Sequence, residues 1–167
     1  MSFLWSILLV LISAVLQCVL PAVGRLSFTH LPLVSVVVVY GMLALDFRCA
    51  VFLALFAGFV KDSLDIGPVG GWMFAFLVIT LIFNRYREQV FAGEVATQAL
   101  FGCVGCGSAS LIYGLVGLLA RAPYFPLLRV ATASLLAGAF GLVLVPLCAV
   151  FVFEPMARKR RLKRRAF

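Results

Sequence analysis

The sequence predicts an all-α integral membrane protein, folded as a compact bundle of about six transmembrane helices. Hydrophobic residues make up 65% of the 167 positions and the mean hydropathy is +1.18, which is more apolar surface than a water-soluble core of this size can enclose. Charged residues make up 12% and collect between long apolar runs. Because a run in lipid must satisfy its own backbone hydrogen bonds, each run is expected to be a helix.

Each expected helix is placed by a run that is low in charge. The first run lacks the basic start of a signal peptide and is longer than a signal peptide's apolar region, so it is interpreted as a membrane helix. The second contains four consecutive valines, which favour a strand in water but would leave unpaired backbone groups in hydrocarbon. The expected helices cover residues 3–23, 28–45, 49–64, 70–84, 95–120 and 130–153, in one transmembrane domain of residues 1–157 followed by a basic tail at 158–167.

The distribution of lysine and arginine predicts the orientation, because basic residues near the ends of spans are retained in the cytoplasm. Ten lie on the side that holds the loops after helices two and four and the C-terminus, against four on the other side. Both termini are therefore predicted to be cytoplasmic. The tail is interpreted as a topology anchor that favours anionic lipid headgroups, with partner binding as the alternative and no role for nucleic acid. Its basic residues are Arg158, Lys159, Arg160, Arg161, Lys163, Arg164 and Arg165.

The stretch GFVKDSLDIGPVGGW places Lys61, Asp62 and Asp65 between two apolar runs. Both runs are too short to cross about 30 Å of hydrocarbon, so helix three is expected to extend into the charges, at the outer membrane boundary. Lys61 and Asp65 would then share a helix face and could pair. Either the lysine snorkels and both aspartates reach water, or Asp62 faces the bundle interior and accepts hydrogen bonds from the backbone of residues 67–71. A re-entrant hairpin, which would leave four full spans, is a further alternative.

Small residues recur along the last two expected helices. At intervals of about four positions they allow helix backbones to approach closely in lipid. We interpret them as packing within the bundle, with docking of a partner's transmembrane helix as the alternative. The spacing Cys103-x-x-Cys106 has no second Cys/His pair, so it is also interpreted as packing. The helix-packing candidates are Gly102, Gly107, Gly114, Ala133, Ala137 and Gly141.

No catalytic constellation is evident in the sequence. Asp62 and Asp65 are the only paired acids, and Lys61 is their only basic neighbour. Ionisable residues lie at the ends of spans, which argues against an ion or proton relay. His30 is interpreted as an interfacial polar residue and Gln17 as a residue that hydrogen-bonds across the bundle. We therefore expect no catalytic residue, no metal site and no cofactor.

One motif resembles a known family. Gly58 lies one turn before Asp62, and a short turn with Pro68 and Gly70 then leads into an aromatic apolar helix. This arrangement is similar to the rod-shape-determining MreD family of bacterial inner-membrane proteins. The chain length, the six short helices and the basic end extend the resemblance over nearly the whole chain, although Lys61 stands where it would place an apolar residue.

The resemblance implies a non-catalytic scaffold of the bacterial cell-elongation machinery that supports peptidoglycan synthesis and cell shape. Its direct partner would be the bitopic protein MreC, and its indirect partners the actin-like MreB, the RodA glycosyltransferase and a penicillin-binding transpeptidase. The motif residues, together with Asp65, would be structural or partner-binding. MreD proteins are also similar in fold to the S components, the substrate-binding subunits of vitamin transporters. An S component for a vitamin or other small molecule is therefore the alternative function.

Overall fold

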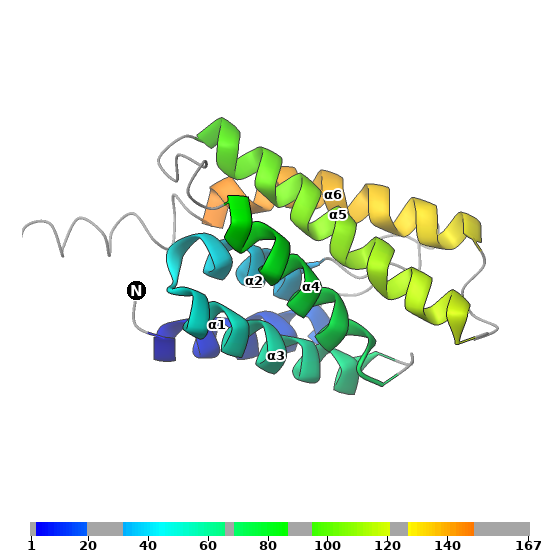
Figure 1. The fold of residues 1–167 in the computed structure, drawn as a ribbon, viewed down its shortest axis with the longest axis horizontal. Coiled ribbons are helices and arrows are strands. Elements are labelled where there is room, and N and C mark those ends of the chain that lie inside the picture. Colours follow the sequence, from blue (N-terminus) through cyan, green and yellow to red (C-terminus); the bar gives the residue numbers. More distant parts are fainter. Residues whose placement is uncertain (1–2, 20–31, 66–68, 87–94, 121–126, 149–167) are drawn as a thin grey trace, which may run out of the picture.

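The structure is a computed structural model that describes residues 3–19, 32–65, 69–86, 95–120 and 127–148. Within these ranges the chain forms six α-helices and no strand, which confirms the predicted all-α class. Figure 1 shows the helices lying roughly along one direction, with α5 and α6 side by side above the other four. The helices are α1 (Phe3–Val19), α2 (Leu33–Ala44), α3 (Phe47–Leu64), α4 (Gly71–Tyr86), α5 (Val95–Leu119) and α6 (Leu127–Cys148).

The start of α2 differs from the prediction. The helix begins at Leu33 rather than at residue 28, and Pro32 lies directly before it. Proline fits this position because it has no backbone N–H to leave unpaired, and its carbonyl still accepts the N–H of Val36 at 3.0 Å. Residues 28–31 lie outside the described part of the chain.

Two other helices begin earlier than predicted. α3 begins at Phe47 and α6 at Leu127, so each takes a basic residue, Arg48 or Arg129, into its first turn. An arginine side chain is long enough to reach a polar boundary from within a helix, so a charge does not mark the helix end as sharply as we expected. The predicted ends at residues 20–23 and 149–153 lie outside the described ranges.

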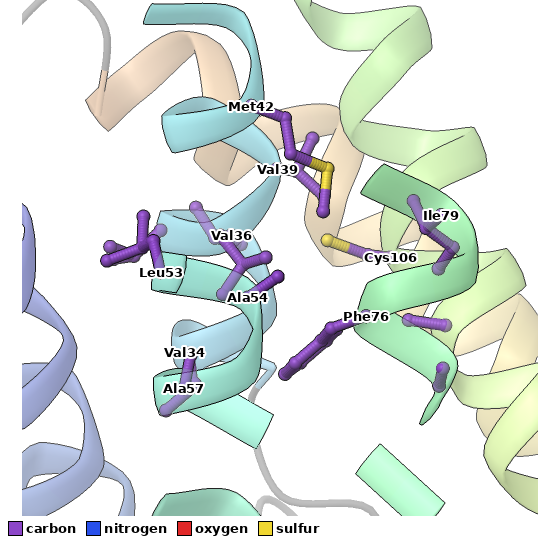
Figure 2. Close-up of a cluster of buried hydrophobic side chains, with 14 of the residues drawn as sticks. Val34, Val36, Val39, Met42, Leu53, Ala54, Ala57, Phe76, Ile79 and Cys106 are labelled. Carbon is purple, nitrogen blue, oxygen red and sulfur yellow. The ribbon is translucent and has the colours of Figure 1, made fainter. Parts of the chain in front are cut away.

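α2 is the centre of the bundle. It contacts all five other helices, and residues 34–39 are all buried. A helix that is apolar around its whole circumference is stable when neighbours cover every face, which explains how the valine run forms a helix. Figure 2 shows the resulting core between α2, α3, α4 and α5, with Val34, Val36, Val39, Leu53, Ala54, Ala57, Phe76, Ile79 and Cys106 labelled.

Glycines hold α5 and α6 in close contact. A Cβ added to Gly102 would overlap the carbonyl oxygen of Gly141, and a Cβ added to Gly141 would overlap that of Gly102. Further along, Gly107 faces Gly138 and Gly114 faces Val130. The structure thus places the predicted small residues of α5 between the two helices. Of the α6 candidates, Ala137 and Gly141 are buried and Ala133 is half-buried.

The polarity of α1 is the reverse of that of a helix on a water-soluble protein. Ser6 and Gln17 are buried on its inner face, together with Val10 and Ala14. Its outer face carries large apolar side chains, among them Leu4, Trp5, Leu8, Leu11, Ile12, Val15, Leu16 and Val19. The inner face is therefore the more polar one.

Charged residues of the described ranges all lie at helix ends. Asp46, Arg48 and Arg85 are at the end of the bundle where α2 is followed by α3, whereas Lys61, Asp62, Asp65 and Arg129 are at the opposite end. Two helices are long and apolar enough to cross a membrane, over Ala96–Leu119 and Leu127–Cys148. The basic tail, on which the predicted orientation mainly depends, lies outside the described residues.

Candidate functional site

The end of the α3–α4 hairpin contains most of the predicted motif. α3 continues through the charges to Leu64, as predicted, so Lys61 and Asp62 lie in its last turn. Asp65 follows as the C-cap residue, and its backbone N–H donates to the Lys61 carbonyl at 3.0 Å. α4 then begins at Gly71 and packs along α3. The first turn of α4 is thereby brought against the last turn of α3.

Asp62 caps the N-terminus of α4. Its carboxylate accepts the backbone N–H of Trp72 at 3.0 Å and that of Met73 at 3.3 Å. The first N–H groups of a helix have no partner within the helix and form the positive end of its dipole, so a carboxylate stabilises them by charge as well as by hydrogen bonding. The predicted donors, residues 67–71, were wrong by one position or more, because α4 starts at Gly71 and turns its next two N–H groups towards α3.

Glycines make this cap possible. A Cβ on Gly58 would lie 2.5 Å from Met73 Cα and 2.7 Å from Met73 N, so only a residue without a side chain allows α4 to approach. Gly58 is one turn before Asp62 and lies on the same face of α3, so both act on the same backbone segment of α4. Gly70 has a φ of +88°, in the left-handed region that favours glycine. Pro68 lies outside the described residues.

Lys61 points into the bundle. The residue is only 4% exposed, its Nζ donates to Ser35 Oγ at 3.2 Å, and it lies 3.4 Å from the centroid of the Trp72 ring. Snorkelling was therefore the wrong expectation, and within the described structure Lys61 forms no ion pair with Asp65. An amine in an apolar interior needs substitutes for water, and here a hydroxyl acceptor and an aromatic face supply them.

Trp72 connects Lys61 and Asp65 to α5. Its indole Nε1 donates to Asp65 Oδ2 at 2.6 Å, and its ring stacks on Tyr113 with centroids 4.2 Å apart and planes at 16°. One indole thus contacts the lysine, an aspartate and a tyrosine. These contacts join α2, α3, α4 and α5 in what we call the Lys61 cluster: Ser35, Lys61, Asp62, Asp65, Trp72 and Tyr113.

Three residues of the Lys61 cluster were not predicted. Ser35 is the one serine of the valine-rich helix α2, and Trp72 directly follows two glycines. Tyr113 lies far along the chain, on α5. A buried hydroxyl and a tryptophan beside a charged turn are weak signals of such a cluster, and no spacing rule connects them to Tyr113.

The contacts of the Lys61 cluster brace α4 against α3. Asp62 is bonded to the backbone of α4, Asp65 to the Trp72 indole, and Lys61 to a hydroxyl and an aromatic face, so each charged group already has a protein partner. Together they fix the angle and depth at which α4 meets α3. In the described ranges, no three His, Cys, Asp or Glu side chains come close enough to hold a metal ion.

The remaining candidate residues lie away from the cluster. Gln17 is buried on α1, and its Oε1 has no hydrogen-bond partner among the described residues, so this oxygen does not make the predicted bond across the bundle. Cys106 is fully buried in the core, whereas Cys103 is half-buried on α5 beside Gly138. His30 lies outside the described residues.

No family model, no curated protein and no solved structure matches this chain. Function is therefore inferred from the contacts of the Lys61 cluster, the polarity of the helices and the motif that resembles MreD.

We expect Gly58→Ala to destabilise the α3–α4 hairpin by about 2 kcal/mol, because the added methyl group meets backbone atoms that cannot rotate away. Thermal unfolding in detergent micelles, followed by circular dichroism, measures the effect. Ser63→Thr is the matched control, since it adds one methyl group at an exposed position of the same helix. Equal melting temperatures for the two variants would contradict the close approach at Gly58.

Proposed function

We propose that this chain is a multi-pass scaffold of the MreD kind in the bacterial inner membrane, with both termini in the cytoplasm. The reversed polarity of α1 supports membrane insertion, because apolar side chains face outward where a soluble protein would present polar ones. Charges confined to the helix ends support a bundle in which further helices cross with α5 and α6.

The scaffold role rests on one observation, the cap that Asp62 forms on α4 beside Gly58. Gly58, Asp62 and Gly70, which belong to the motif that resembles MreD, thereby have a structural task. They rigidify the outer turn of a hairpin and leave its charged groups engaged with the protein. Such a site presents a surface of fixed shape, as a scaffold requires, and has no free group poised for catalysis.

The partner surface that we propose includes the tip of this hairpin. Val69 is 95% exposed and lies between the capped end of α3 and the start of α4. Gly102 and Gly141 are used for packing α5 on α6, so they are not available to a partner helix. In this proposal the membrane-proximal segment of an MreC-like bitopic protein contacts the hairpin tip. The cytoskeletal and cell-wall enzymes of the elongation machinery are then reached through that partner.

A photo-crosslinking amino acid at position 69 tests this contact in native membranes. We expect it to capture a bitopic protein, whereas the same amino acid at Leu81, which is exposed on α4 away from the tip, should not. Capture of the same protein with equal yield at both positions would contradict recognition at the tip.

Affinity purification followed by mass spectrometry tests the wider proposal. Co-purification of a bitopic MreC-like protein with cell-wall synthases is the expected result. Paired ATPases with a transporter membrane subunit would instead favour the S-component alternative. Asp62→Asn and Asp62→Ala should both reduce recovery of the partner at matched membrane abundance, and undiminished recovery with both would remove Asp62 from the mechanism.

A further inference from the structure

The Lys61 cluster lies below the tip of the α5–α6 hairpin. Because Tyr113 stacks on Trp72, it marks the depth of the cluster on α5. From Tyr113 the helix continues without a charge to Leu119, which adds about 9 Å at ~1.5 Å per residue. Figure 1 shows α5 and α6 projecting beyond the end of α3 and the start of α4. At this end of the bundle, α5 and α6 therefore extend farther than α3 and α4.

The charge-free part of α3 and α4 is short. On α4 the distance along the axis from the capped Trp72 to Arg85 is about 20 Å, and on α3 that from Arg48 to Asp62 is about 21 Å. A typical hydrocarbon core is about 30 Å thick. The two helices on this face thus fall short of an ordinary bilayer by about a third.

On the face formed by α5 and α6, the charge-free helix length matches the thickness of an ordinary hydrocarbon core. α5 has 25 residues without a charge, and α6 has 19 charge-free residues after Arg129, which correspond to about 38 Å and 29 Å. The bundle therefore offers lipid two different apolar thicknesses on two of its faces.

At the cluster end, no charged side chain of α3 or α4 in the described ranges extends outward to make up for the short length of these helices. Arg48 and Arg85 are exposed at the opposite end and have long side chains that can extend to headgroups. Lys61 is instead held inward by Ser35 and Trp72, and the short Asp62 side chain is bonded to backbone. Since Asp62 and Asp65 keep part of their surface exposed, hydrocarbon that extended past them would bury carboxylates.

Between its charged ends the short face is strongly apolar. Phe59 on α3 and Phe74 on α4 are 61% and 54% exposed, within about one turn of the cluster. Such side chains require contact with acyl chains up to the depth of the charges. The surface therefore fits lipid whose polar boundary comes down to the Lys61 cluster.

We infer that the α3–α4 face binds a locally thinned bilayer and selects lipids with short acyl chains, whereas the α6 face takes chains of ordinary length. The thinning lies in the leaflet at the cluster end. This inference rests on the membrane placement in the proposed function. Its physical cause is hydrophobic mismatch, which is relieved either by thinning or by enrichment of shorter lipids.

Tryptophan quenching by brominated lipids tests the inference on the intact protein in vesicles. One reporter is Phe74→Trp on α4, and its matched control is Leu135→Trp on α6, which is also apolar and 74% exposed. Both are made in a Trp5→Phe background, and that parent supplies the signal of the buried Trp72 for subtraction. Dimyristoleoyl or dierucoyl phosphatidylcholine then competes with brominated dioleoyl phosphatidylcholine. A second pair, Phe59→Trp and Leu142→Trp, repeats the comparison where a variant fails to fold.

At the Phe74→Trp reporter we expect the short-chain lipid to relieve quenching several-fold better than the long-chain lipid. The Leu135→Trp reporter should have no such preference for short chains. Quenching of both reporters with the same chain-length preference would overturn the inference while leaving membrane placement intact. Absence of quenching at both would overturn the membrane placement, and the inference with it.

Discussion

Gly102→Val is expected to separate α5 from α6 and to lower the free energy of unfolding by about 3 kcal/mol. A Cβ at this position would overlap the carbonyl oxygen of Gly141 and would lie 2.8 Å from Val145 Cβ. The carbonyl oxygen of Gly141 is a backbone atom, so no rotamer change relieves the overlap and a whole helix must move. In the membrane placement that we propose, close packing rather than water exclusion drives helix association, so the lost contact has no hydrophobic replacement.

Two controls separate this effect from added volume alone. Gly107→Ala introduces a Cβ that would lie 3.3 Å from the Ser134 carbonyl oxygen, so a small shift accommodates it and we expect a change below about 1 kcal/mol. Ala139→Val adds volume at an exposed position of α6. Melting temperatures in detergent micelles rank the three variants. A Gly102→Val protein as stable as the Gly107→Ala protein would show that α5 and α6 do not cross at Gly102.

Asp62→Ala is expected to lower the free energy of unfolding by about 2 kcal/mol, because the N–H groups of Trp72 and Met73 lose a charged acceptor. Asp62→Asn should have a smaller effect, since its amide oxygen still accepts one hydrogen bond but carries no charge for the helix dipole. The neighbouring hydroxyl provides a control: Ser63 is exposed and donates to the Phe59 carbonyl in its own helix, so Ser63→Ala should be nearly neutral.

Hydrogen exchange distinguishes loss of the cap from general destabilisation. In the Asp62→Ala protein the amides of Trp72 and Met73 should exchange faster than in the parent protein, whereas mid-helix amides of α4 should change less. The Asp62→Asn protein should be intermediate at the same two amides. Uniform acceleration along α4, or no change at its first turn, would contradict the cap.

The all-α class was predictable from the apolar runs. These runs, including the valine run of α2, were expected to be helices since an isolated strand in lipid would leave its backbone groups unpaired, and the structure has helices there. Helix ends were less predictable, because Arg48 and Arg129 lie within helices that were expected to begin after them. The extension of α3 to Leu64 followed from a length argument, and it was right.

The candidate site was only half predictable. The motif residues Gly58 and Asp62 were identified, and a bond from Asp62 to the backbone before helix four was one of the two alternatives. The direction of Lys61 was not predicted correctly, because a charged side chain at a helix end normally reaches for water. Its burial depends on Ser35 and Trp72, which come from two other helices. Local spacing cannot reveal a pocket that is assembled in this way.

The amino-acid sequence by itself determined the all-α class, the approximate helices and the small-residue positions, because these depend on composition and on periodicity along one chain. Only the tertiary structure decided which groups satisfy the charges: α4 provides the donors for Asp62, and α2 and α4 provide the environment of Lys61. It also decided the depth of these charges relative to α5, through the stacking of Trp72 on Tyr113. The physical reason is that a buried polar group is stabilised by whatever lies beside it in space, and in a helical bundle those neighbours come from distant parts of the chain.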